Sequence, residues 1–360
     1  MIDRLDVRVS EKIHAELLLS SPTKPRFGVA AIGLLFVSIV VTLVNVALVV
    51  GGVWIMVTSS APLFSALIAV PMVLCGLWPY VGLLRRGDRR QVVLAHDDFG
   101  DLYEMVAALA ADRSQGVSRI HLDLDWNASV RSGWRGRSLT IGLPLWLALD
   151  QPQRAAVIGH ELGHFDNGDP RRSWVAWSAM STVQAWRATL DIGARGVASN
   201  LILMIIKAPI KLLEVVIDLL SLRERRRAEY FADVLGSQRA GSDAMIGALT
   251  VTATNRSTAE FVLRRGVTRE SLGELVATLN DLTPTERLRR ARRAELRMTP
   301  EPSATHPPVG HRIAVLRAHP FGRPAVIPLT SDQLDERLIA AGVESVQGVQ
   351  ANVRQARRRR

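Results

Sequence analysis

The sequence predicts a mainly α-helical protein with a small antiparallel β-sheet, and three observations lead to that fold class. Two uncharged apolar runs, Gly28–Val57 and Ala61–Leu84, each exceed the roughly 20 residues that a membrane-spanning helix needs. Apolar and polar residues alternate strictly in two short segments, 119–126 and 138–143, as is typical of half-buried strands. From Gln153 onward apolar residues recur mostly at helical spacing, so helices are expected to dominate the rest of the chain.

The two apolar runs predict a transmembrane helical hairpin over residues 28–84. Their link, Thr58–Pro62, is a short neutral turn, and residues 1–27 before the first run are too many and too polar for a cleaved signal peptide. Basic residues flank the hairpin but not its turn, which predicts that both ends lie in the cytoplasm. These residues are Lys24, Arg26, Arg85, Arg86, Arg89 and Arg90. We therefore expect a multi-pass protein of the cell membrane whose remaining domain is cytoplasmic.

The composition fits this interpretation and excludes some kinds of site. Lys and Arg number 45 against 34 Asp and Glu, a net charge of +11, which suits nucleic acid, anionic lipid or the cytoplasmic flanks of membrane spans. The basic residues cluster beside the spans and at the C-terminus, not in an aromatic-interleaved stripe, so no nucleic-acid partner is expected. The single cysteine, Cys75, lies in an apolar run, so a metal here needs nitrogen and oxygen ligands.

Beyond the hairpin, an amphipathic helix is expected over Asp97–Asp112, where Leu102, Met105, Val106 and Leu109 recur at helical spacing. The two alternating segments follow and are expected to pair as an antiparallel sheet. Three helical segments come next, Arg154–Phe165, Ser173–Leu190 and Val197–Leu220. The pattern leaves open whether residues 173–220 enter the membrane, because the last segment is strongly apolar at 201–206 and then carries charges at helical spacing.

These elements predict four regions. They are an N-terminal cytoplasmic segment (1–27), the transmembrane helical hairpin (28–84), a main domain (85–320) with possible membrane-associated helices at 173–220, and a basic C-terminal tail (321–360).

The strongest chemical signal is the pattern His160-Glu161-Leu162-Gly163-His164 in an apolar, helix-compatible context. Residues four apart share one helical face, so both imidazoles can reach a single Zn²⁺ ion. Glu161 projects beside them, where it can take a proton from metal-bound water. The pattern therefore predicts a zinc-dependent hydrolase, and the alternative of ordinary surface histidines leaves these polar residues on an apolar helix unexplained.

Catalytic zinc usually has three protein ligands, so a third is expected elsewhere in the chain. The best candidate is Glu229, and Asp233 one turn later can steady a ligating imidazole through its free N–H. From spacing alone Glu229 could equally form an intrahelical ion pair with Arg225. Asp169 is open in the same way, as a loop or cap residue or as a residue that orients the metal-binding helix.

Several separated motifs resemble the membrane-bound zinc peptidase family that contains the heat-shock protease HtpX and the type I CaaX prenyl endopeptidases. They are His160–His164 followed by Asn167-Gly168-Asp169, Glu229-x-x-Ala232-Asp233, Asn127-Ala128, Thr140–Pro144, and Thr305-His306-Pro307-Pro308 followed by Arg312. The resemblance spans about Ala95–Leu316 and the preceding hairpin. HtpX-like proteins carry two further apolar spans before the third ligand, whereas Ser173–Leu190 here is broken by polar residues.

The resemblance implies a zincin-like (gluzincin) metallopeptidase domain with one Zn²⁺ per chain and an endopeptidase that cleaves peptides or proteins, misfolded membrane proteins among them. It implies that Glu229 is the third ligand and that His306 and Arg312 approach the active site and help to stabilise the oxyanion. An extended substrate is expected to add to the sheet edge near Ser138–Leu143. The alternative is a non-catalytic membrane regulator with a structural zinc site, although such a site has no use for Glu161 beside the metal. The sequence does not indicate the natural substrate or the oligomeric state.

Overall fold

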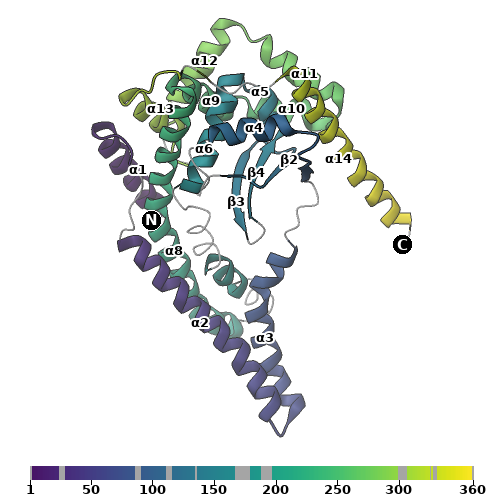
Figure 1. The fold of residues 1–360 in the computed structure, drawn as a ribbon. Helices are drawn as coiled ribbons and strands as arrows, with labels where there is room; N and C mark the ends of the chain where they lie inside the picture. The colour runs from purple at the N-terminus through teal and green to yellow at the C-terminus, as the bar shows by residue number, and fades with distance from the viewer. Residues whose placement is uncertain are drawn as a thin grey trace.

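The computed structural model describes residues 2–23, 29–85, 91–110, 116–133, 136–166, 179–187, 197–298, 306–324, 326 and 331–358. A domain containing the sheet lies at one end of the molecule, and two long helices extend from it (Figure 1). The first elements are α1 (Ile2–Leu19), α2 (Val29–Thr58), α3 (Pro62–Arg85), β1 (Val92–Leu94), α4 (Gly100–Leu109), β2 (Arg119–Asp123), β3 (Ala128–Gly133), β4 (Gly136–Gly142), α5 (Leu143–Ala148) and α6 (Gln151–Asp166). They are followed by α8 (Val197–Ala240), α9 (Ser242–Thr254), α10 (Arg256–Val262), η2 (Leu263–Arg265), α11 (Arg269–Asn280), α12 (Pro284–Glu295), α13 (Val309–Ala318) and α14 (Asp332–Arg358).

The sheet is mixed and not antiparallel, which corrects the sequence-based prediction. Its strand order is β1-β2-β4-β3, with β2 parallel to β4 and the other two pairings antiparallel. β3 and β4 pair as a hairpin that closes at Gly133 and Gly136, so β4 returns alongside β2 in the same direction. The prediction of a sheet edge near Ser138–Leu143 is also wrong, because β4 is an inner strand and the two edge strands are β1 and β3.

The core of this domain lies between the sheet and the helices that pack against it. Ile120 and Leu122 of β2 and Leu139 and Ile141 of β4 are buried, as their alternation predicts. Leu102, Met105, Val106 and Leu109 of α4 are buried too, which confirms the predicted apolar face of that helix.

α6 and α8 pack closely, and small residues make this possible. A Cβ on Gly236 of α8 would lie 2.7 Å from the carbonyl oxygen of Ala156, and one on Gly163 of α6 would lie 3.0 Å from a methyl carbon of Leu235. α8 is a single helix of 44 residues that continues twenty residues beyond the end expected at Leu220. Its second half therefore lies along α6, where it can carry polar side chains to the His160–His164 face.

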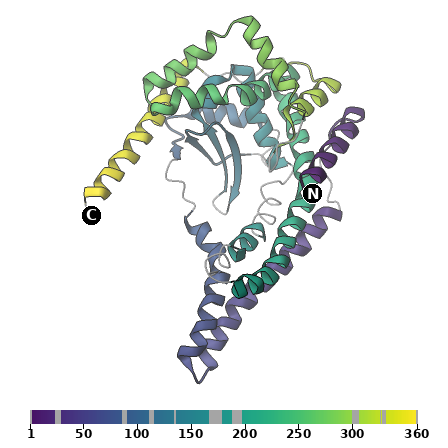
Figure 2. The same cartoon turned by 180° about the vertical axis from the view of Figure 1, so that it is seen from behind.

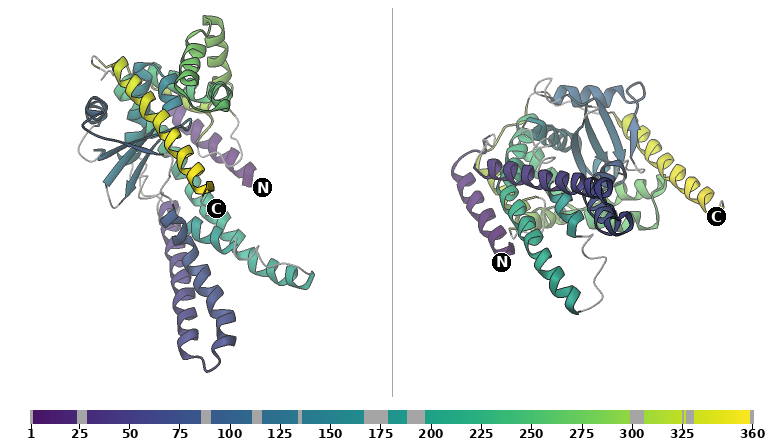
Figure 3. Two further views of the ribbon diagram at one scale, coloured as in Figure 1. Left: turned by 90° about the vertical axis from the view of Figure 1, so that its right-hand side faces the viewer. Right: turned by 90° about the horizontal axis from the view of Figure 1, so that it is seen from below.

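α2 and α3 are joined by residues 59–61 and lie side by side (Figures 1 and 3). The side-chain amide of Asn45 donates to the carbonyl oxygen of Gly76 at 2.8 Å, and Gly76 lets the two backbones approach. Among the described residues one helix, Ala30–Thr58, is long and apolar enough to cross a membrane, and 22% of its apolar window is buried. Large apolar side chains such as Phe36, Trp54 and Leu63 are exposed, so these helices present an extensive apolar surface.

The N-terminal helix α1 lies against α8 and α13 (Figure 2). Ile13 and Leu17 are buried with Tyr230 and Val315 in a small apolar cluster. At the same contact the rings of His14 and His311 stack, with centroids 4.0 Å apart and an interplanar angle of 5°. The sequence pattern predicts residues 1–27 only as an N-terminal cytoplasmic segment and does not indicate that residues 2–19 pack against the main domain.

The stacked imidazoles predict that this contact weakens in acid. Burial lowers the pKa of His311 to about 4, and the positive potential of His14 and Arg226 adds to the effect. Because an unfolded histidine titrates near 6.5, the unfolded chain binds more protons between these values, so stability falls as pH falls from about 6.5 towards 4. The free energy of unfolding should drop by about 2 kcal/mol between pH 7 and pH 5 from His311 alone. Thermal melting of detergent-purified His311→Phe should depend less on pH than melting of the unchanged protein, and equal slopes would contradict this.

Candidate metal centre

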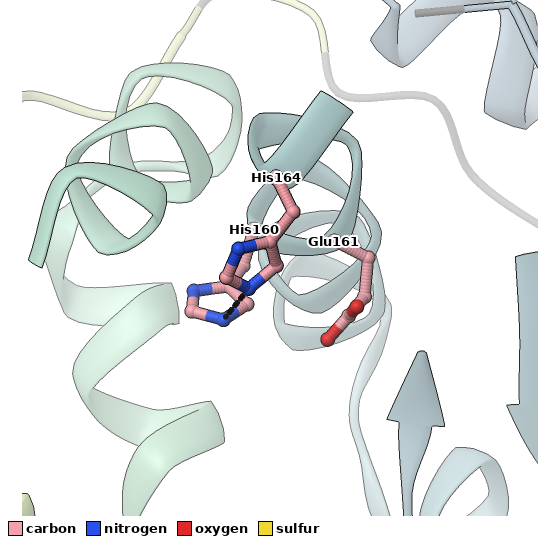
Figure 4. Close-up of side chains that lie close together, drawn as sticks. All are labelled: His160, Glu161 and His164. Carbon is pink, nitrogen blue, oxygen red and sulfur yellow. Dashed lines mark hydrogen bonds between the residues drawn. The ribbon is translucent and has the colours of Figure 1, made fainter. Parts of the chain in front are cut away.

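The two histidines and the glutamate of the predicted motif lie on α6, on neighbouring positions of its surface (Figure 4). The Nε2 atoms of His160 and His164 are 3.3 Å apart, and the ligand atoms of these two residues and Glu161 all lie within 4.8 Å of one another. His160 and Glu161 are buried. The helical spacing therefore brings both imidazoles to one point, with a carboxylate beside them.

Glu229 reaches the same point from α8. Its Oε2 lies 3.7 Å from Nε2 of His160, and its Oε1 lies 3.7 Å from Nε2 of His164. Two ligand atoms that each lie 2.0–2.1 Å from a tetrahedral ion are about 3.3–3.4 Å apart, so the three side chains have nearly the spacing that one Zn²⁺ requires. Two imidazoles and one carboxylate are also a common ligand set of catalytic zinc. The residues present fit the metal.

The sequence also allowed an ion pair between Glu229 and Arg225, but the guanidinium of Arg225 lies near a different carboxylate. This guanidinium is 3.9 Å from the carboxylate of Asp218 on the same helix. Glu229 contacts the two histidines of α6, and it also contacts His306 and Arg312.

Asp233, one turn beyond Glu229, lies behind His160. Its Oδ1 is 3.0 Å from Nδ1 of His160, the ring nitrogen that faces away from His164 and Glu229. Arg312 of α13 donates from Nε to Oδ2 of Asp233 at 2.7 Å and from Nη2 to its other oxygen. Such a contact leaves the proton of His160 on Nδ1 and the lone pair on Nε2, where a metal needs it.

His306 completes the polar cluster, and its side chain is 55% exposed. Its Nδ1 lies 2.7 Å from Oε2 of Glu229. The structure therefore brings together seven of the eight predicted site residues, which are His160, Glu161, His164, Glu229, Asp233, His306 and Arg312. Asp169 lies outside the described residues.

The charges of the cluster differ in a way that suits acid–base chemistry. Burial raises the pKa of Glu161, although the neighbouring histidines oppose this. Burial also acts to raise the pKa of Glu229, but His306, Arg312 and His164 outweigh it and hold that pKa well below its usual value. The pKa of Asp233 is likewise lowered, since Arg312 outweighs burial. Glu229 and Asp233 thus stay ionised, whereas Glu161 is shifted towards the range in which it can exchange a proton.

Two hollows flank the cluster. Glu161 lines a small pocket of about 10 Å³ whose walls include Leu139, Ile141 and Val157. His306 lines a larger open groove of about 730 Å³ between the β2–β3 connection and α9 and α10. Asn127 lines both hollows, so they adjoin where the resemblance places one of its strand motifs.

Arg154 also lines the small pocket, and its partner Asp335 lies on α14. Sequence analysis missed this pair. The two residues are 181 positions apart, so no local pattern joins them.

A comparison with known families supports the motif assignments. The model of peptidase family M48, the family of HtpX and the CaaX prenyl endopeptidases, matches residues 104–319, which is more than half of the chain. This confirms the resemblance inferred from the motifs. No curated protein and no solved structure shows significant similarity to the chain. The chain belongs to peptidase family M48, and it is therefore a metallopeptidase, a hydrolase that acts on peptide bonds.

Proposed function

We propose that the chain is an integral-membrane, zinc-dependent endopeptidase of the HtpX type. His160, His164 and Glu229 would hold one Zn²⁺ per chain. The observation that carries the proposal is the convergence of two Nε2 atoms 3.3 Å apart with a carboxylate 3.7 Å from each. A zinc ion bound there would supply Lewis acidity towards the scissile carbonyl and make an attacking water more acidic.

The chain's own residues divide the remaining work. Glu161 accepts a proton from the attacking water and then delivers it to the leaving amine, which its raised pKa favours. His306 lines the open groove and supports charge at the oxyanion, since contact with Glu229 is the largest of the effects that raise its pKa. Arg312 is buried against Asp233, so we assign it a positioning role: it holds the carboxylate that orients His160.

The substrate backbone is proposed to add to β3. Among the described residues no strand pairs with the outer side of β3, and an extended peptide can pair with a strand edge of this kind. The start of β3 lies close to Glu161, because Asn127 and Ala128 line the small pocket together with Glu161. Main-chain pairing of this kind gives broad sequence tolerance, which suits substrates such as misfolded membrane proteins.

The apolar surface of α2 and α3 supports insertion into a bilayer. Exposed side chains such as Phe36, Leu63 and Phe64 would lie in lipid, where their exposure costs nothing. The helices lie on the side of the domain away from α11 and α12 (Figure 1). Together with the basic residues that flank the hairpin in the sequence, this favours a multi-pass protein with the metallopeptidase domain in the cytoplasm.

Cleavage by detergent-purified protein tests the proposed function. Casein or an unfolded membrane protein should be cut internally, a chelator should abolish the cleavage, and added zinc should restore it. Circular dichroism after chelation serves as the control for loss of fold. The alternative, a non-catalytic regulator with structural zinc, predicts bound zinc without cleavage and a fold that is lost on chelation. Glu161 beside the three converging ligands is the feature that argues against it, because a structural zinc site has no use for a free carboxylate there.

A further inference from the structure

The C-terminal helix α14 is anchored in the domain at its first turns, although it lies outside residues 104–319, the region that matches the peptidase family. Leu334 and Leu338 are buried in the core cluster that contains the sheet. Asp335 accepts hydrogen bonds from Arg154 of α6 at 2.8 and 3.0 Å and from Trp146 of α5 at 2.8 Å. The domain therefore fixes the direction in which the rest of the helix runs.

The far end of α14 reaches the level at which the two long apolar helices leave the domain. From Leu338 to Arg354 the helix rises about 24 Å, since each residue adds about 1.5 Å. It runs towards the side of the domain from which α2 and α3 extend, and it ends near the height of the domain-side end of α3 (Figures 1 and 3). A bilayer that surrounds α2 and α3 would have its surface close to this height.

This end of α14 is strongly basic. Five of the residues 354–360 are arginine, and residues 345–360 contain no Asp or Glu. Val346, Val349 and Val353 recur at helical spacing just before the arginines. A helix that combines an apolar face with basic residues is typical of elements that lie at a membrane surface. The like charges also oppose pairing with the same helix of a second copy.

We propose that the basic end of α14 binds the anionic lipid headgroups of the membrane surface and so gives the metallopeptidase domain a second contact with the bilayer, beside the α2–α3 hairpin. The inference rests on the proposed insertion of that hairpin. The cytoplasmic leaflet carries a negative surface potential, which attracts clusters of about four to eight Lys or Arg residues held near it. Residues 354–360 contain such a cluster, and the anchored helix holds its first members at the required height.

A second arginine-rich helix provides an internal comparison. α12 has five arginines between residues 287 and 293, but it lies on the side of the domain away from α2 and α3 (Figure 1). A bilayer around the hairpin cannot reach it. Charge alone would therefore make the two helices equivalent, whereas position relative to the membrane distinguishes them.

Fluorescence quenching of the full chain in nanodiscs tests this inference. Gln355→Cys carries the fluorophore in a Cys75→Ala background, because Cys75 is the single cysteine of the chain. The nanodiscs contain phosphatidylcholine with or without phosphatidylglycerol, and a trace lipid carries a quencher on its headgroup. Quenching should be about threefold or more greater in the anionic nanodiscs. It should fall to the neutral level in about 1 M salt, where the Debye length is about 3 Å.

Matched variants of the two helices separate local contact from net charge. Three arginines of each helix are replaced by glutamine, so both variants lose the same charge. The substitutions are Arg354→Gln, Arg357→Gln and Arg358→Gln in α14, and Arg289→Gln, Arg292→Gln and Arg293→Gln in α12. The α14 variant should lose about half or more of the extra quenching in anionic nanodiscs, and the α12 variant should keep it. Both sets lie outside the buried core, so the fold should be retained.

The outcomes distinguish this inference from the proposed membrane insertion. Equal quenching in the two kinds of nanodisc, or quenching that the α14 variant leaves unchanged, would overturn the contact of α14 with anionic lipid. An equal loss in the α12 variant would overturn it as well, because the effect would then follow from net charge. A chain that does not enter nanodiscs at all would instead contradict the insertion of α2 and α3.

Discussion

Glu161→Gln is expected to lower kcat for peptide cleavage by about 10²–10⁴-fold while the protein still binds zinc. The amide has nearly the size and shape of the carboxylate, so packing of α6 is preserved, but it cannot accept a proton. Glu161 lies beside the ligand histidines and is not itself one of the three converging ligands. The loss should therefore appear in kcat and not in metal content.

Steady-state kinetics on one peptide, together with zinc analysis of the same samples, measure this effect. Glu104→Gln is a suitable control, since Glu104 is exposed on α4. A Glu161→Gln protein with normal kcat would refute the role of Glu161 as the proton carrier. A variant that loses its zinc would show that Glu161 is needed to hold the metal.

Asp233→Ala should produce the largest combined effect on stability and metal binding. The carboxylate of Asp233 is 1% exposed and contacts both His160 and Arg312. Its removal leaves the guanidinium of Arg312 buried without its principal partner, which typically costs about 3–5 kcal/mol. It also releases His160 from its orientation, which typically lowers metal affinity by about 10–100-fold.

Denaturant unfolding and competitive zinc titration measure these two effects separately. Asp243→Ala provides a control, because Asp243 is an exposed carboxylate in the first turn of α9. Asp233→Asn should recover much of the stability, since the amide keeps an acceptor oxygen for Arg312. If Asp233→Ala binds zinc as tightly as the unchanged protein, Asp233 does not orient a metal ligand.

The sequence predicted the part of the site that is local. His160, Glu161 and His164 share one helix, and helical geometry alone brings their side chains together. Glu229 could be identified by its motif, but its distance from His160 depends on the close packing of α6 and α8. That packing requires small residues such as Gly236, whose role is visible only when the two helices are placed side by side.

The arrangement of the sheet could not be predicted in the same way. β3, with the sequence Ala-Ser-Val-Arg-Ser-Gly, alternates over only four residues and carries a single large apolar side chain, so its pattern is too weak to indicate a strand. If β3 is left out, β2 and β4 are two successive strands, for which an antiparallel pairing is expected. The hairpin between β3 and β4 instead reverses the chain once more, so β2 and β4 are parallel. Strand order depends on such long-range pairing and not on the local pattern.

The elements at the two ends of the chain show the same limit. α1 packs against α13 although about 300 residues separate them in the sequence. His319, the residue that follows α13, contacts the carbonyl oxygen of Leu17 in α1 through its Nε2, and the two residues are 302 positions apart. The segment predicted as a basic tail, 321–360, contains the helix α14, whose Leu334 and Leu338 are buried in the core. In both cases amphipathic spacing permits a helix, but only the tertiary structure shows which surface it covers.

X-ray absorption at the zinc edge of the detergent-purified protein tests the central claim most directly. The account predicts one zinc per chain with two imidazole nitrogens and oxygen ligands at about 2.0–2.1 Å, and loss of an oxygen ligand in Glu229→Leu. A spectrum with sulfur at about 2.3 Å, or one that is identical in Glu229→Leu, would contradict the convergence of His160, His164 and Glu229 on one metal ion.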